Sequence, residues 1–158
     1  MPVDPAYRTF VSYIDKSREF YLARGYGNPY RWACFPTVPF APLGKPLADC
    51  RVGLITTAAR SRDDARAKQV FAAASDPPPG ALYTDHLAWD KEATHTNDVE
   101  SFLPIRRLGE LGRVGAVSPR FYGIPTQYSQ SRTIEQDVPD VVRACREDEL
   151  DAVLLVAL

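Results

Sequence analysis

Both histidines of the chain, His86 and His95, lie in one polar segment, "YTDHLAWDKEATHTNDVESFLP". A loop with this many titratable groups can build a general acid–base pair, since a histidine exchanges a proton near neutral pH and a carboxylate can orient its ring. We predict that His86 and His95 are catalytic and that Asp85 and Asp98 contribute to substrate binding. Two alternatives stay open. His86, His95 and Asp98 could hold a metal ion, or the carboxylates could cap turns while the histidines bond to backbone.

Further polar side chains follow predicted strands. Arg120 comes after a short predicted strand in "SPRFYGIPTQYSQSRT", and Thr56 and Thr57 end the strand of "CRVGLITTAA". The carboxyl ends of parallel strands share one edge of a sheet, where ligands of open α/β proteins bind. We therefore predict Arg120, Thr56 and Thr57 as substrate-binding residues, with Arg120 clamping an anion. The alternative is a salt bridge of Arg120 beside aromatic residues packed on the core.

The cysteines do not form a recognisable redox or metal motif. Cys34, Cys50 and Cys145 are far apart and odd in number, which is typical of reduced thiols in a cytoplasmic protein. None follows a helix start that would lower its pKa, so we expect small buried residues rather than nucleophiles. The chain also lacks a glycine-rich phosphate loop.

The elements that must position these residues alternate between strand and helix. The patterns predict strands at 51–57, 113–117 and 151–157 and helices at 4–24, 61–74, 103–112 and 133–150. Such alternation favours an α/β fold with a parallel, Rossmann-like sheet in a three-layer arrangement. We expect the first and last strands to be parallel and adjacent or one apart. The apolar run "AVLLVAL" should be buried on both faces.

Length and composition set the outer limits. The 158 residues suit a single α/β domain or half-domain, with an N-terminal helix at about 4–24 and a proline- and aromatic-rich arm at about 25–49. The net charge of −1 provides no basic surface for nucleic acid or anionic membrane. No apolar stretch approaches the ~20 residues that span a bilayer. We expect a small-molecule substrate and a homo- or hetero-oligomer.

Several blocks resemble the selenoprotein B–like family of the glycine, sarcosine and betaine reductases and of D-proline reductase. The most distinctive are "THTNDVESFLP", "RFYG-PT" and "CREDELDAVLLV", and the resemblance covers nearly the whole chain. It implies a cytoplasmic, thiol- or selenol-dependent reductase that cleaves a C–N bond in a small amine or amino acid derivative. It also implies a hetero-oligomer in which a partner can carry a pyruvoyl group.

In that family the redox pair, Cys-x-x-Cys or Cys-x-x-selenocysteine, directly follows the strand that "DAVLLVAL" resembles. None of the three cysteines here corresponds to that pair, so this chain would carry no cofactor of its own. We expect the thiol or selenol pair to come from a partner or from a missing segment. A second polypeptide or a missing C-terminal half would then complete the sheet. The alternatives are a binding or assembly protein without the redox pair, and a metal-dependent lyase or hydrolase that uses His86 and His95.

Overall fold

The computed structural model describes residues 12–27, 35–38, 41–84, 96–126 and 129–157, which belong to two compact units, Met1–Pro39 and Phe40–Leu158. In the first unit, helix α1 spans Tyr13–Ala23. It begins where the Ser12 hydroxyl accepts a hydrogen bond from the Asp15 amide at 3.2 Å. It ends before Gly25, whose φ of +83° suits a helix stop. The described part of the predicted helix 4–24 is thus helical, and residues 1–11 lie outside the described residues.

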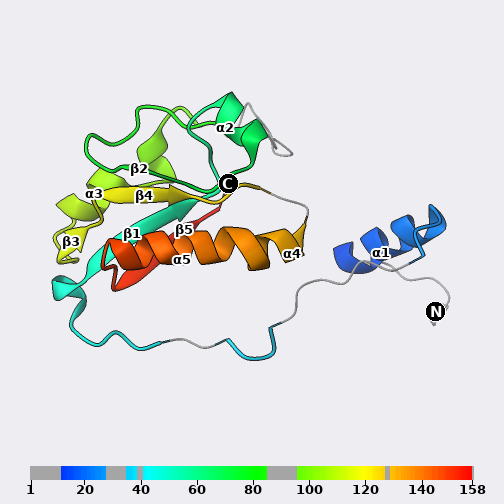
Figure 1. Ribbon diagram of the computed structural model, residues 1–158, viewed down its shortest axis with the longest axis horizontal. Coiled ribbons are helices and arrows are strands. Elements are labelled where there is room, and N and C mark those ends of the chain that lie inside the picture. Colours follow the sequence, from blue (N-terminus) through cyan, green and yellow to red (C-terminus); the bar gives the residue numbers. More distant parts are fainter. Residues whose placement is uncertain (1–11, 28–34, 39–40, 85–95, 127–128, 158) are drawn as a thin grey trace, which may run out of the picture. The chain divides into compact units, whose positions relative to one another are not determined.

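The second unit is built on a five-stranded, mostly parallel sheet (Figure 1). Its strands are β1 (Arg51–Thr56), β2 (Phe71–Ala74), β3 (Ala116–Val117), β4 (Arg120–Gly123) and β5 (Ala152–Val156). The central strand β1 pairs in parallel with β5 on one side and with β3 and β4, one after the other, on its other side. Strand β2 is antiparallel to β4 at the edge. The predicted parallel pairing of the first and last strands is confirmed, from Val52 beside Ala152 to Thr56 beside Val156.

Helices cover both faces of this sheet. On one face α5 (Val138–Glu147) places Val141 against Ile55 and Tyr122. On the other face a 3-10 turn, η2 (Val99–Ser101), and helix α3 (Ile105–Glu110) pack over Leu54 and Phe121. The protein is therefore a mixed α/β structure in which β1 lies between two apolar layers.

The segment predicted as one helix at 61–74 is a short helix followed by a strand. Helix α2 spans only Arg62–Ala67 and ends at Lys68, which has a left-handed φ of 49°. The alanine-rich continuation then forms β2, because pairing with β4 and a ring contact between Phe71 and Phe121 (centroids 5.9 Å apart) outweigh the helix propensity of alanine. Strand β4 likewise occupies a segment that the sequence predicted as loop.

The helix predicted at 133–150 starts earlier and contains an irregular turn. It begins with α4 (Gln130–Arg132), capped by Ser129, and continues through a π-helical turn at Thr133–Asp137 into α5. Proline lacks the amide hydrogen that an α-helix needs, so Pro139 near the start of α5 favours this wider turn directly before it.

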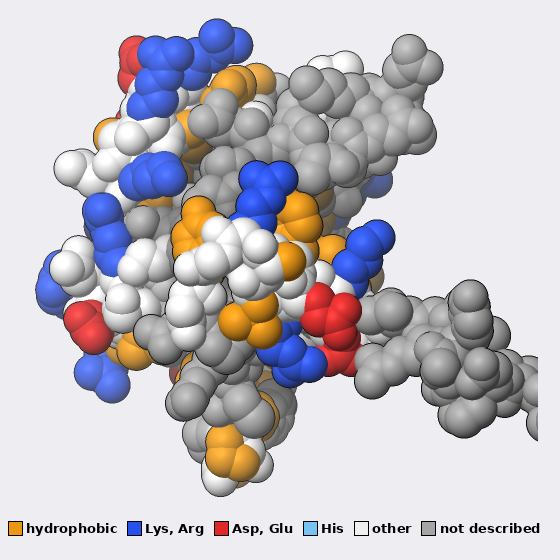
Figure 2. Space-filling view, turned by 90° about the vertical axis from the view of Figure 1, so that its right-hand side faces the viewer, with side chains coloured by type: hydrophobic (Ala, Val, Ile, Leu, Met, Phe, Trp, Pro, Cys, Tyr) orange, Lys and Arg blue, Asp and Glu red, His pale blue; other side chains and the backbone are white. Residues whose placement is uncertain are grey.

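The strand that we expected to be buried on both faces, β5, lies at the edge of the sheet and is partly exposed. The exposed fractions are 39% for Val153, 43% for Leu154 and 74% for Leu155. The reason is its place in the sheet: β1 is the strand it pairs with among the described residues, and its other edge has no partner there. On the face shown in Figure 2, hydrophobic side chains form separate small areas between basic and polar ones. Within the described ranges no helix is long and apolar enough to cross a membrane.

Candidate functional site

The carboxyl ends of the parallel strands meet at one edge of the sheet. Thr56, the last residue of β1, lies beside Gly123 of β4 and beside Val156 of β5. The Ile124 amide donates to the Thr56 carbonyl at 2.9 Å, which keeps the loop after β4 against the loop after β1. The strand ends therefore bring residues from three distant parts of the sequence together.

A small recess opens at this edge. Loops after β1 and β4, helix α2 and the segment before residue 85 all contribute to it. Its polar and aromatic lining consists of Thr57, Asp64, Gln69, Phe71, Tyr83, Thr84 and Thr126. The recess has a volume of about 30 Å³, so its hydroxyl groups, carboxylate and aromatic rings surround space for a water molecule or for one small polar group of a ligand.

Backbone contacts hold this recess in shape. Ala59 and Tyr83 exchange two backbone hydrogen bonds, each of 2.7 Å, and form an isolated antiparallel bridge. Helix α2 starts directly afterwards, where the Ser61 hydroxyl accepts from the Asp64 amide at 3.1 Å. Tyr83 and the start of α2 are therefore fixed against each other rather than left to loop motion.

The predicted site residues are distributed over both ends of the sheet. Thr57 lines the recess. Thr56 is only 1% exposed, and its hydroxyl accepts a hydrogen bond from the Ala58 amide at 3.2 Å. It therefore stabilises the loop after β1 and does not line the recess. Asp98 precedes η2 and lies 3.9 Å from Arg107 as a largely exposed ion pair. Asp85, His86 and His95 lie outside the described residues, although the recess residue Thr84 directly precedes Asp85.

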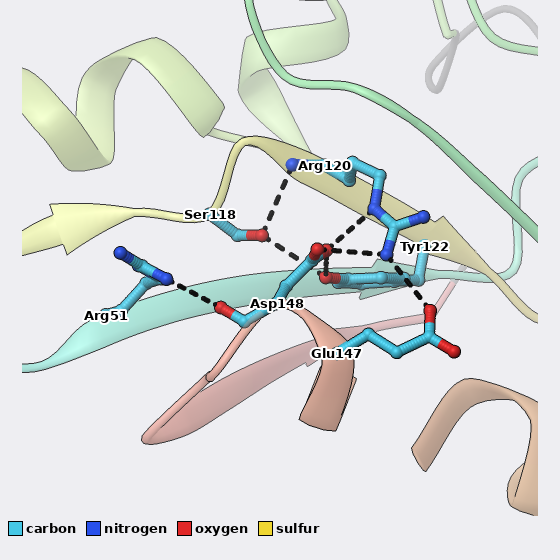
Figure 3. A network of polar contacts seen from close by, with 6 residues as sticks. All are labelled: Arg51, Ser118, Arg120, Tyr122, Glu147 and Asp148. Carbon is cyan, nitrogen blue, oxygen red and sulfur yellow. Dashed lines mark hydrogen bonds and ion pairs between the residues drawn. The ribbon is translucent and has the colours of Figure 1, made fainter. Parts of the chain in front are cut away.

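Arg120 lies at the opposite end of the sheet from the one that we expected. The short strand before it continues, after Ser118 and Pro119, as β4, so Arg120 begins a strand instead of following one. Its guanidinium group binds both oxygens of Asp148, at 2.8 and 2.9 Å (Figure 3). The salt bridge that the sequence left open as an alternative is therefore present.

Asp148 is the centre of a polar network at this end (Figure 3). Besides Arg120, the buried hydroxyl of Tyr122 donates to its carboxylate, and the Arg51 side chain donates to its backbone carbonyl at 2.8 Å. The Arg120 guanidinium, helped by Tyr122, lowers the pKa of Asp148 below its ordinary value. Burial, with the nearby Asp148 carboxylate, raises the pKa of Tyr122 to about 12. The network connects the end of α5 to β1 and β4 and therefore stabilises the packing of this helix on the sheet.

The two described cysteines are poor nucleophiles. Cys50 is fully buried, with its sulfur 3.4 Å from the Pro46 carbonyl oxygen. Burial raises the pKa of the Cys145 thiol, which reduces its thiolate fraction. Among the described residues no group of three His, Cys, Asp or Glu side chains could hold a metal ion. The metal alternative depended on His86 and His95, which are not among them.

Sequence reasoning did not predict the recess residues Asp64, Tyr83 and Thr126. Tyr83 lies at the recess because its backbone pairs with that of Ala59, and no local sequence pattern predicts this pairing. A usable signal existed for two of them: Tyr83 immediately precedes the polar "TDH", and Thr126 ends the block "RFYGIPT".

Comparison with known proteins found no matching family model, curated protein or solved structure.

Proposed function

We propose that this chain is part of a cytoplasmic thiol- or selenol-dependent reductase that cleaves a C–N bond in a small amine or amino acid derivative. The supporting observation is the recess at the carboxyl ends of β1 and β4. Two of the blocks that resemble the reductase family, "GLITTA" and "RFYG-PT", supply Thr57 and Thr126 to it. His86 and His95 would act as proton donor or acceptor for a substrate bound there, with Asp85 and Asp98 as their polar neighbours.

The position of β5 is consistent with a redox pair near the recess that supplies the electrons. In the family that the chain resembles, the redox pair follows the strand that corresponds to β5. Here Val156 of β5 lies beside Thr56, at the same edge as the recess. A pair that continues from this strand, or that a partner presents to it, would thus reach the substrate. The dithiol would become a disulfide, and its two electrons and two protons would convert the C–N bond into a C–H and an N–H bond.

We further propose that a second polypeptide or a further segment continues the sheet beyond β5, in a Rossmann-like three-layer arrangement. The apolar residues Val153, Leu154 and Leu155 are exposed on both sides of this strand. Strands of parallel sheets are normally covered on both faces, and uncovered apolar edges promote association.

The test is a reductive-cleavage assay on the native protein together with any chain that co-purifies with it. Glycine, sarcosine, betaine and D-proline are supplied with dithiothreitol under anaerobic conditions, and the released amine (for D-proline, the ring-opened amino acid) is quantified. We expect product to form, and prior alkylation of the thiols to abolish it. A complex that forms none of these products would contradict the proposal. Ligand binding without turnover would instead favour the binding or assembly protein without a redox pair.

A further inference from the structure

Helix α5 and the π-helical turn before it carry an exposed apolar stripe. Its residues Ile134, Val138 and Val142 are 53%, 41% and 39% exposed. They are spaced four residues apart, so they follow one another along one side of the helix. Val138 and Val142 also line a shallow groove whose charged rim includes Arg146. An apolar row with charged residues beside it is typical of surfaces that bind other proteins.

Other residues of α5 form the side that faces the sheet. Val141 is 3% exposed and packs with Ile55 and Tyr122, and Ala144 and Cys145 pack against the same cluster. The helix lies on the outside of the sheet (Figure 1). The stripe is therefore not required for the core of this unit and is available to a second molecule.

Two opposite charges lie at the two ends of the stripe. Glu135 is at its N-terminal end and Arg146 at its C-terminal end, and both are exposed. Their positions differ by 11 residues, which is roughly 16 Å along a helix, so they cannot pair with each other within one chain. Neither forms an ion pair with another described residue, whereas Asp140 and Arg143 of the same helix pair at 2.7 Å. Both ends of the stripe therefore offer a charge to a neighbour.

We propose that this stripe is the interface of a homodimer, in which α5 packs antiparallel to the α5 helix of a second copy about a two-fold axis. Glu135 and Arg146 are centred near the level of Asp140, and so are Val138 and Val142. A two-fold axis at that level thus places Glu135 of each copy opposite Arg146 of the other. It also places Val138 of each copy opposite Val142 of the other. One symmetry operation satisfies the apolar residues and the charges together, as a self-complementary interface requires.

The surface is small, since it consists of one helix face with three apolar side chains. Small interfaces are weak, so we expect a dimer that forms and dissociates with concentration. The charges then fix the antiparallel register more than they add affinity. This dimer goes beyond the proposed function and does not depend on the reductase activity.

Sedimentation velocity of the full chain over a range of concentrations tests the dimer through charge reversal. Glu135→Arg and Arg146→Glu each place like charges opposite each other in both symmetric contacts. Each substitution should weaken the dimer at least about tenfold. The double variant Glu135→Arg/Arg146→Glu should dimerise like the wild type.

An equimolar mixture of the two single variants is the sharpest measurement. In a heterodimer of Glu135→Arg with Arg146→Glu, both contacts again join opposite charges, so the mixture should dimerise although each variant alone remains largely monomeric. Val142→Glu should weaken the dimer of the otherwise unchanged chain, because it puts a charge into the apolar stripe. Circular dichroism checks that each variant is folded.

The control is Arg113→Glu, which makes the same change of charge as Arg146→Glu at an exposed position outside α5. It should dimerise like the wild type. A wild type that stays monomeric at every concentration would overturn the proposal, and so would a mixture that dimerises no better than the single variants. Association that is indifferent to both charge reversals would assign it to another surface, such as the open edge of β5, and would also overturn the α5 dimer.

Discussion

Asp148 joins three elements through a single side chain and its carbonyl. Its carboxylate accepts from Arg120 and from the buried Tyr122, and its carbonyl accepts from Arg51. Because only 13% of the Asp148 side chain is exposed, water can replace few of these contacts. Removal of the carboxylate would leave the buried Tyr122 hydroxyl with Ser118, at 3.2 Å, and the Arg120 guanidinium with Glu147, at 3.5 Å, as their remaining partners.

We expect Asp148→Ala to lower the free energy of unfolding by about 1–3 kcal/mol, because it removes the charged acceptor that Tyr122 and Arg120 share. Urea denaturation measures this change. Asp140→Ala is the matched control, since Asp140 pairs with Arg143 on the exposed side of α5. The control should change stability by no more than about 0.5–1 kcal/mol. Equal effects of the two substitutions would show that the network contributes no more than a surface ion pair.

Tyr122 should titrate apart from an ordinary tyrosine. Its pKa is raised to about 12, against about 10 for a free phenol, so the folded state holds the proton more tightly than the unfolded state. The stability from this residue is therefore fully present below about pH 10 and is lost as the pH rises through about 12. A tyrosinate absorbance titration of the wild type should contain a late component that Tyr122→Phe lacks. A difference curve centred near pH 10 would contradict this.

The backbone just before β3, at Gly115, lies close to the backbone of a neighbouring turn. A Cβ atom on Gly115, just before β3, would lie 2.7 Å from the Ala48 carbonyl oxygen and 2.8 Å from the Asp49 carbonyl carbon. Both atoms belong to the 3-10 turn η1 (Leu47–Asp49), which cannot move as a flexible side chain can. We expect Gly115→Ala to destabilise the fold by about 1–3 kcal/mol in urea denaturation.

Gly80→Ala provides the comparison for Gly115→Ala. A Cβ atom there would have no atom within 4 Å, and Gly80 has no left-handed φ. We expect its stability to stay within about 0.5–1 kcal/mol of the wild type. Comparable losses in both variants would mean that η1 yields to the added methyl group.

The sequence predicted those elements whose pattern is local. The β1 and β5 strands are short apolar runs, and α5 has a clear apolar face, so their positions and the parallel pairing followed from the residues alone. The predictions failed where a residue's secondary structure depends on a partner that is distant in the sequence. The segment of β2 is alanine-rich and forms a strand because it pairs with β4. The site shows the same limit. Thr57 was predicted from the end of β1, but Tyr83 depends on its bridge to Ala59.

At the scale of the whole molecule, β5 exposes the apolar edge of the sheet. Leu155, which is 74% exposed, is its most accessible side chain. We expect the chain to associate in a concentration-dependent way through this edge, or to bind a partner there. Leu155→Glu should reduce that association, because a charge on the strand opposes desolvation by a neighbour. Sedimentation velocity over a range of concentrations measures it.

Leu111→Glu is the control for Leu155→Glu. Leu111 is 63% exposed at the C-terminal end of α3, a helix that packs beside β3. It should leave association unchanged. If both variants and the wild type sediment as the same monomer at every concentration, and no partner chain binds, the open edge has no role in assembly.

The pairing of the central strand also determines when the fold can form during synthesis. The partners of β1 are β3, β4 and β5, and the contact of Arg51 with Asp151 joins residues 100 positions apart. At a translation rate of roughly 5–20 residues per second, β1 is synthesised roughly 5–20 s before β5. During that interval its apolar residues Val52, Leu54 and Ile55 are available to chaperones that bind nascent chains.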